Sequence, residues 1–359
     1  MIDRRNLLKD TLIGGVALSL LSPADVLAAD DPYLRYVHPE LRDMAKFFGT
    51  ISPGTKPLSM ATLEAQRAGM KRFSRPLRKD VPVEKRTLPG AKGQPDVTFH
   101  LINAAPGEAR PAIVNTHGGG FVLGDAMGDV AGLQDICAEL GTVAISVEYR
   151  LAPETTWAGS VEDNYAALKW LHANAASVGA DPARIAVLGG SAGGGHAALL
   201  AITARDRGQV PLTFQCLIYP MLDDRTGSLG PLGRPVPPHV GHLVWNAESN
   251  RFGWRSFLGQ EPGRVKAPKG AVPARLADLS GLPPAFIGVG SLDLFHDEDV
   301  EYARRLNDAG VGCELIVVPG AFHGFDMAGL INPKNRLAAW FNAAKLDALR
   351  RGLGIATAG

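Results

Sequence analysis

Short apolar runs, bounded by turn-forming residues, recur along the chain from about residue 83 onward. Several are almost continuously apolar, which is typical of parallel strands that are covered on both faces. Seven of these runs are predicted strands, at residues 97–102, 112–116, 143–147, 185–188, 214–219, 285–289 and 315–318.

Amphipathic helical patterns lie between the predicted strands. Residues 160–174 carry apolar side chains down one face, with Ser160 as the expected N-cap. Residues 194–205 and 299–309 are also predicted helices, and Gly310 is expected to end the second. This alternation of strands and helices predicts a doubly wound, mostly parallel α/β sheet.

Two stretches interrupt the alternation. Residues 30–82 precede the strand pattern and contain two amphipathic stretches divided by Pro53 and Gly54, so we expect a helical cap segment. Residues 223–280 are rich in proline, glycine and large aromatic side chains, and they lie between two predicted strands. We interpret them as an insertion that forms a second part of the lid on a catalytic domain spanning residues 83–359.

The first 29 residues have the three parts of an export signal: a charged start with Arg4 and Arg5, an apolar middle over 11–21, and a small-residue end. Paired arginines followed by leucines resemble the twin-arginine signal. We therefore expect export by the twin-arginine machinery to the periplasm or beyond, with cleavage near Ala28 or Ala29. An uncleaved anchor is the alternative, although the apolar run is short for a transmembrane helix.

Composition narrows the class of partner. The 359 residues are 46% hydrophobic and 20% charged, with a formal net charge of +1, and the mature part has no basic cluster. Nucleic acid is therefore not an expected partner. Stable insertion into a membrane is not expected either. Cys137, Cys216 and Cys313 are widely spaced in apolar segments, which predicts buried thiols rather than disulfides. The oligomeric state, a homodimer included, stays open.

The strongest chemical signal is the sequence Gly189-Gly190-Ser191-Ala192-Gly193, directly behind a predicted strand and before a predicted helix. A serine in such a strand-to-helix turn presents its hydroxyl away from the backbone, as a nucleophile must. The alternative is a tight packing turn whose serine only caps the helix. Serine catalysis also needs a base, an orienting acid and backbone donors for the oxyanion.

The backbone donors have a clear candidate. His117-Gly118-Gly119-Gly120, called the glycine loop below, follows the predicted strand 112–116. A triple glycine at a strand end lets backbone N–H groups turn toward a substrate. We expect the amides of Gly118, Gly119 and Ala192 to form the oxyanion hole, and His117 to hold the loop rather than act as a base.

The candidates for the acid and the base lie in the loops that follow the last two predicted strands. Asp293 follows the predicted strand 285–289, at the carboxyl edge where parallel sheets place their sites. His323 lies in the loop after the last predicted strand, and the order Ser191, Asp293, His323 is that of α/β-hydrolases. His296 is the rival base, disfavoured because it is close to Asp293 in sequence.

Five ordered motifs carry a family resemblance, which covers roughly residues 85–345. They are 117–120, Tyr149-Arg150-Leu151-Ala152-Pro153-Glu154, Gly190-Ser191-Ala192-Gly193-Gly194, and the loops of Asp293 and His323. Together they resemble the hormone-sensitive lipase family of bacterial esterases. The resemblance implies an α/β-hydrolase fold with an N-terminal cap and ester hydrolysis without a cofactor, on short to medium acyl chains. Two positions depart from the family: Gly190 replaces its usual aspartate and Leu294 its usual proline.

Other candidate chemistry is weaker. His239 and His242, with Asp223 and Asp224 nearby, lack the glutamate and the helical context of a zinc protease, so no metal is expected. The predicted function is a serine carboxylic-ester hydrolase that works through an acyl-enzyme. Two alternatives remain: an exported acetyl esterase acting on polysaccharide, and a non-catalytic binding module.

Overall fold

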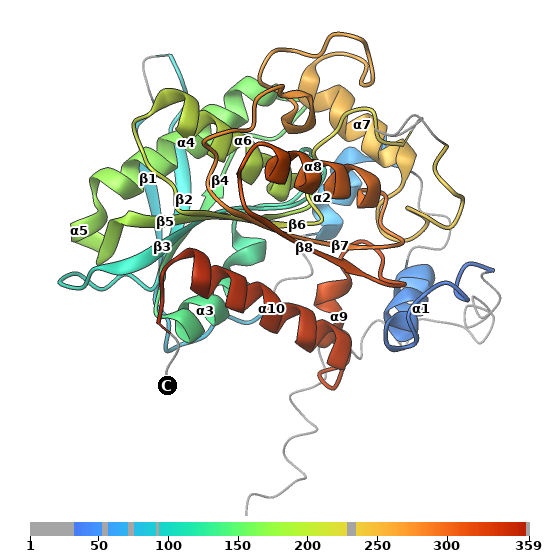
Figure 1. The fold of residues 1–359 in the computed structure, drawn as a ribbon, viewed down its shortest axis with the longest axis horizontal. Coiled ribbons are helices and arrows are strands. Elements are labelled where there is room, and N and C mark those ends of the chain that lie inside the picture. The colour runs from blue at the N-terminus through green and yellow to red at the C-terminus, as the bar shows by residue number, and fades with distance from the viewer. Residues whose placement is uncertain (1–31, 52–56, 71–74, 91–92, 228–234, 357–359) are drawn as a thin grey trace, which may run out of the picture.

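The computed structural model describes residues 32–51, 57–70, 75–90, 93–227 and 235–356. Within them an eight-stranded sheet runs in the order β1-β2-β4-β3-β5-β6-β7-β8 (Figure 1). The strands are β1 Val83–Leu88, β2 Val97–Ile102, β3 Arg110–Thr116, β4 Val143–Glu148, β5 Ala180–Gly190, β6 Phe214–Ile218, β7 Ala285–Gly290 and β8 Cys313–Val318. Only the β1–β2 and β2–β4 pairs are antiparallel, so the predicted mostly parallel sheet is confirmed.

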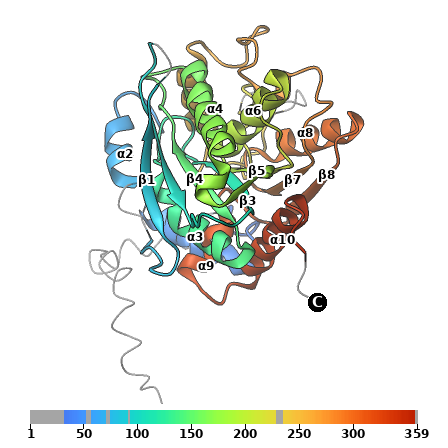
Figure 2. The same ribbon diagram turned by 90° about the vertical axis from the view of Figure 1, so that its left-hand side faces the viewer.

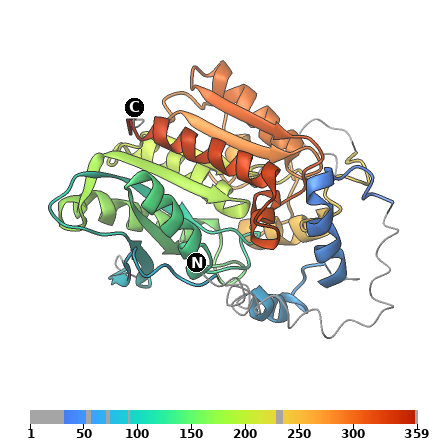
Figure 3. The ribbon, with the colours of Figure 1, turned by 90° about the horizontal axis from the view of Figure 1, so that it is seen from below.

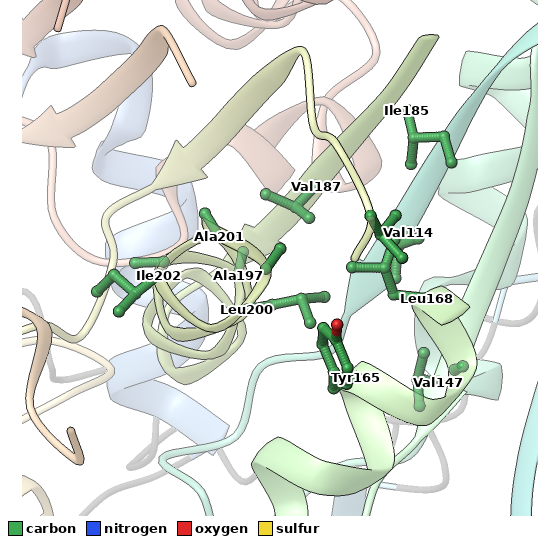
Figure 4. Close-up of a cluster of buried hydrophobic side chains, with 14 of the residues drawn as sticks. Val114, Val147, Tyr165, Leu168, Ile185, Val187, Ala197, Leu200, Ala201 and Ile202 are labelled. Atoms are coloured by element: carbon green, nitrogen blue, oxygen red, sulfur yellow. The ribbon is translucent and has the colours of Figure 1, made fainter. Parts of the chain in front are cut away.

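The apolar runs bury side chains on both faces of the sheet because successive residues of a strand point in opposite directions. In β5, Ile185 and Val187 enter one hydrophobic cluster, whereas Ala186 and Leu188 enter the cluster on the other face. Figure 4 shows part of the first cluster, where Val187 packs against side chains from the neighbouring helices. A strand that is buried on both faces carries apolar side chains at successive positions instead of alternating apolar and polar ones, which explains the continuous apolar runs in the sequence.

Helices cover the two faces in separate layers (Figures 1 and 2). The helices on one face are α4 Trp157–Ala173, α6 Ala192–Arg207 and α8 His296–Asp308, and those on the other are α3 Met127–Leu140 and α10 Arg336–Gly352. Figure 3 shows α3 and α10 crossing the second face. Two single-turn helices, α5 Ala175–Val178 and α9 Ala328–Ile331, complete these layers.

Several predicted boundaries need correction. Helix α4 begins at Trp157, with Thr156 in the N-cap position, so the prediction of Ser160 as N-cap is wrong. The Ser160 hydroxyl lies inside the first turn and donates a hydrogen bond to the Trp157 carbonyl. Helix α8 begins three residues before the predicted start, at His296, and Gly310 follows its end with a φ of 76°, as a C-terminal glycine does.

The described parts of residues 30–82 hold α1 Arg42–Ile51 and α2 Leu63–Met70, and the insertion 223–280 holds α7 Ala247–Leu258. Leu58 and Leu63 share a hydrophobic cluster with aromatic residues of the insertion, and the Leu58 N–H donates to the Ser249 hydroxyl at 3.2 Å. The two segments far apart in sequence therefore pack together. The predicted export signal, residues 1–29, lies outside the described residues.

The described residues allow the cysteine thiols and the helix lengths to be compared with expectation. Cys137 and Cys216 are buried and free, as predicted, whereas the free thiol Cys313 is only half-buried because it starts the edge strand β8. Among the described residues, none of the helices has the length and apolar character needed to cross a membrane.

Candidate active site

Ser191 occupies the sharp turn between β5 and α6. Its backbone has φ 59° and ψ −127°, a conformation that an L-residue adopts only under strain. The glycines at both ends of the motif are required by close packing. A Cβ added to Gly189 would lie 2.3 Å from the Gly193 carbonyl oxygen, and one added to Gly193 would lie 2.1 Å from the Thr116 oxygen. No side chain larger than hydrogen fits at either position.

Hydrogen bonds to neighbouring strands hold this strained turn in place. The Ser191 N–H donates to the Ile218 carbonyl at 2.9 Å, and the Ser191 carbonyl accepts from Met221 N–H at 2.9 Å. The Thr116 hydroxyl, at the end of β3, donates to the Gly193 carbonyl at 2.7 Å. The ends of β3 and β6 therefore both fix the serine.

A chain of three side chains starts at Ser191. Its Oγ lies 2.9 Å from His323 Nε2, and His323 Nδ1 lies 2.8 Å from Asp293 Oδ2. The other carboxylate oxygen of Asp293 accepts a hydrogen bond from Phe295 N–H at 3.0 Å, and the side chain of Asp293 is 0% exposed. The carboxylate is thus oriented toward the imidazole from a position closed to solvent.

The sheet topology explains how residues 132 positions apart in sequence meet. Ser191, Asp293 and His323 follow β5, β7 and β8, which lie in one parallel part of the sheet with their carboxyl ends at the same edge. The rival base, His296, has a different carboxylate partner, because its Nδ1 lies 2.9 Å from Asp297 Oδ1.

Aromatic rings surround the imidazole of His323. Tyr219 lies 4.6 Å away and Phe295 5.4 Å away, measured between ring centroids. Burial raises the pKa of Tyr219 well above its ordinary value, so its hydroxyl stays protonated and donates to Asp326 at 2.6 Å. His323 is only 6% exposed among these rings, and such an apolar environment strengthens its hydrogen bonds.

The glycine loop lies beside the serine. A Cβ added to Gly118 would lie 3.6 Å from the Cβ of Ser191, which places the loop's backbone directly against the nucleophile position. Gly119 has φ 125°, a left-handed value that a side chain would oppose. Ala192 is the first residue of α6, where the helix dipole places partial positive charge.

His117 supports the loop from below. Its Nδ1 lies 2.9 Å from the Gly118 carbonyl, and its ring stacks on Tyr149 at 4.1 Å between centroids. The Tyr149 hydroxyl donates to the His117 carbonyl at 2.6 Å. These contacts agree with the expected supporting role of His117.

Arg67 of helix α2 is a supporting residue that sequence analysis missed. Its Nε donates to the Val122 carbonyl at 2.8 Å, just beyond the glycine loop, and its Nη2 donates to the Ala152 carbonyl at 3.0 Å. It also forms a two-pronged ion pair with Glu154. Glu154 therefore supports the loop through Arg67, whereas Arg150 binds Asp163 in the second turn of α4.

Gly190 and Leu294, the two positions that depart from the family pattern, are both accommodated by their neighbours. A Cβ added to Gly190 would meet nothing closer than the Tyr219 ring at 3.5 Å, so this position has room for a side chain. Leu294 is buried in the cluster shared by the cap segment and the insertion. Each position is next to a member of the site in sequence, but neither supplies a group to the hydrogen bonds that join Ser191, His323 and Asp293.

The suggested metal ligands have other partners. His239 stacks on Tyr36, and His242 meets Tyr33 edge-on. Asp223 and Asp224 form ion pairs with arginines 225 and 275 respectively. Across the described ranges, no three histidine, cysteine, aspartate or glutamate side chains gather as a metal-ligand group.

Two buried carboxyl groups lie on α8, close behind the loop of Asp293. Glu298 accepts hydrogen bonds from Leu222 N–H at 2.6 Å and Asp223 N–H at 3.2 Å, whereas neither carboxyl oxygen of Asp299 has a partner in the described part of the chain. Burial is the main cause that raises the pKa of both groups well above the ordinary range. Burial therefore favours the neutral carboxylic acid form of Asp299.

Comparison with known proteins identifies the fold family. Residues 113–327 match a family model described as "alpha/beta hydrolase fold". Carboxylesterase NlhH of Mycobacterium tuberculosis is 36% identical over 304 residues, which cover 81% of this chain and 90% of that protein. The chain belongs to the alpha/beta hydrolase family.

Two further relatives of this hydrolase are esterases by name. Esterase LipI of Mycobacterium tuberculosis is 32% identical over 310 residues, covering 86% of the chain and 91% of LipI. A solved structure titled "Bacterial Heroin Esterase" superposes with a TM-score of 0.79 at 35% identity, covering 89% of this chain and 99% of that one. The hydrolase is thus a member of the hormone-sensitive lipase family of bacterial esterases and an enzyme of the carboxylesterase type.

Proposed function

We propose that the enzyme hydrolyses esters of short to medium acyl chains through a covalent acyl-enzyme on Ser191. The observation that supports this most strongly is the hydrogen-bonded chain from Ser191 Oγ through His323 to Asp293, set beside a glycine loop. Each member supplies a separate requirement of a serine nucleophile.

In the proposed mechanism, His323 Nε2 accepts the proton of the Ser191 hydroxyl as Oγ attacks the ester carbonyl carbon. The carbonyl oxygen becomes negative and receives hydrogen bonds from the amides of Gly118, Gly119 and Ala192. Asp293 accepts the Nδ1 hydrogen bond and stabilises the imidazolium. His323 then protonates the leaving alkoxide, and the acyl group stays on Oγ.

Deacylation repeats the same steps with water. His323 accepts a proton from the water molecule, which attacks the acyl carbonyl carbon. The second tetrahedral intermediate collapses when His323 returns the proton to Ser191 Oγ, releasing the carboxylic acid. No cofactor takes part in this sequence.

Replacement of Ser191 by alanine tests the proposal. We expect Ser191→Ala to lose hydrolysis of p-nitrophenyl butyrate while its circular dichroism spectrum stays that of the wild type. Ser177→Ala removes an exposed serine of α5 and is the matched control, with unchanged turnover expected. Turnover retained by a folded Ser191→Ala protein would refute the assignment of the nucleophile.

We further propose that residues 1–29 direct export by the twin-arginine route, as their charged, apolar and small-residue parts suggest. Export makes acetyl groups on a polysaccharide a second candidate substrate. Release of acetate from acetylated xylan, at a rate comparable to that from p-nitrophenyl acetate, would favour this candidate. Mass spectrometry of the exported protein tests the signal, and finding Arg4 at or near its N-terminus would contradict cleavage.

A further inference from the structure

Trp245 of the insertion lies beside both the glycine loop and His323. A Cβ added to Gly120 would lie 2.1 Å from Cη2 of the Trp245 ring, so the indole rests directly on the bare backbone of the loop. The ring centroids of Trp245 and His323 are 6.5 Å apart. The indole therefore forms a wall next to the place where the ester carbonyl would be held.

The orientation of the indole is fixed by a buried hydrogen-bond chain. Trp245 Nε1 donates to Asn250 Oδ1 at 3.1 Å, and Asn250 Nδ2 donates to the Thr226 carbonyl at 2.9 Å. Asn250 is fully buried and Trp245 is only 7% exposed. A side chain held in this way cannot turn aside without breaking this hydrogen bond in a dry environment.

The backbone is strained to bring the indole to this place. Val244 has φ 68°, which a β-branched residue disfavours, and Trp245 N–H donates across it to the Leu243 carbonyl at 2.8 Å, as in a tight γ-turn. The Val244 side chain is 44% exposed, so its own burial does not offset the strain. The turn places the next residue, Trp245, with its ring against Gly120.

The surroundings indicate which part of the substrate meets the indole. Trp245 belongs to an apolar cluster that includes Phe121, Met221, Trp254 and Phe257. An acyl chain is apolar and stays joined to the carbonyl carbon beside the glycine loop, the backbone on which the indole rests. The side of the site that Trp245 occupies is therefore suited to the acyl chain.

We propose that Trp245 is a specificity-determining residue that closes the acyl side of the site and restricts the enzyme to short acyl groups. This inference rests on the proposed ester hydrolysis at Ser191. It explains why the loop residue beneath the indole is Gly120, since any side chain there would displace the ring.

The test compares p-nitrophenyl acetate, butyrate, hexanoate and octanoate with the wild type and Trp245→Ala. We expect wild-type kcat/KM to fall beyond butyrate. Opening the wall gives room for added methylenes, each worth about fourfold in kcat/KM when buried. Trp245→Ala should therefore raise the octanoate-to-acetate ratio at least about tenfold.

Two further variants keep the test decisive. Trp245→Leu retains an apolar side chain that cannot reach Gly120, and it carries the test if the alanine variant does not fold; we expect the same direction of change. Trp340→Ala is the matched control, because that tryptophan is 51% exposed on α10, a helix that supplies none of the three side chains of the site. Its octanoate-to-acetate ratio should equal that of the wild type.

A second series holds the acyl group constant as acetate and lengthens the alcohol. We expect the Trp245 variants to follow the wild type across this series. An unchanged acyl profile, or a shift confined to the alcohol series, would overturn the proposal. A wild type that hydrolyses none of the esters and is not labelled by a fluorophosphonate would instead show that the proposed function itself is wrong.

Discussion

Replacement of Arg67 by alanine separates two contributions to the attachment of helix α2. The guanidinium bonds the carbonyls of Val122 and Ala152, and it pairs with Glu154, whose side chain is 62% exposed. An exposed ion pair contributes less than about 1 kcal/mol, because solvent and salt screen it. A hydrogen bond from a charged donor contributes about 1.5–3 kcal/mol, part of which water replaces when the donor is removed.

We therefore expect Arg67→Ala to lower the free energy of unfolding by about 2–4 kcal/mol, and Glu154→Ala to lower it by less than about 1 kcal/mol. Arg67→Lys should fall between them, because an ammonium retains the charge but cannot reach both carbonyls as a planar fork. Urea unfolding followed by circular dichroism at equilibrium measures all three. Equal losses in Arg67→Ala and Glu154→Ala would refute the argument that the carbonyl bonds dominate.

Two other substitutions test the site's packing and its buried acid. Burial raises the pKa of Asp299 in the folded protein. The contribution of its neutral form to the free energy of unfolding is therefore fully present below the unfolded-state pKa of about 3.9, and it is lost as pH rises through the raised folded-state pKa. Asp299→Asn cannot ionise, so its melting temperature should fall less than the wild type's between pH 5 and pH 9, and parallel curves by scanning fluorimetry would contradict this. Gly193→Ala should cost about 1–3 kcal/mol in urea unfolding and most of the esterase activity, because its Cβ would collide with the Thr116 carbonyl. Gly132→Ala is its control, since an added Cβ there meets nothing within 4 Å, and an equal loss in both would count against the packing argument.

The central strands were predictable because burial on both faces leaves a continuous apolar run in the sequence. Strand β1 carries no such run, since Val83–Leu88 is mostly polar and lies at the edge of the sheet. The first residues of β5, before Ile185, carry no continuous apolar run either, and Ala180 joins the sheet by pairing with Arg110. Local pattern thus indicates the strands that carry an apolar run, the edge strand β8 included, and misses the polar edge strand β1.

The same division holds for the candidate site. The motifs of Ser191, Asp293 and His323 end strands of one parallel sheet, so the rule of the carboxyl edge predicts that they meet. The residues around them are different, because Arg67 reaches a carbonyl 55 positions away and Trp245 contacts Gly120 across the insertion. Such contacts follow from how the cap segment and insertion pack, and no periodicity in the sequence encodes that packing.

The central claim is that Ser191 is the nucleophile. Incubation with a fluorophosphonate, followed by digestion and peptide mass spectrometry, tests it most directly because the reagent phosphonylates an activated serine hydroxyl. We predict one adduct per chain, on the peptide that contains Ser191, and none in Ser191→Ala. An adduct on a different residue, or an active esterase that takes up no label, would contradict the account.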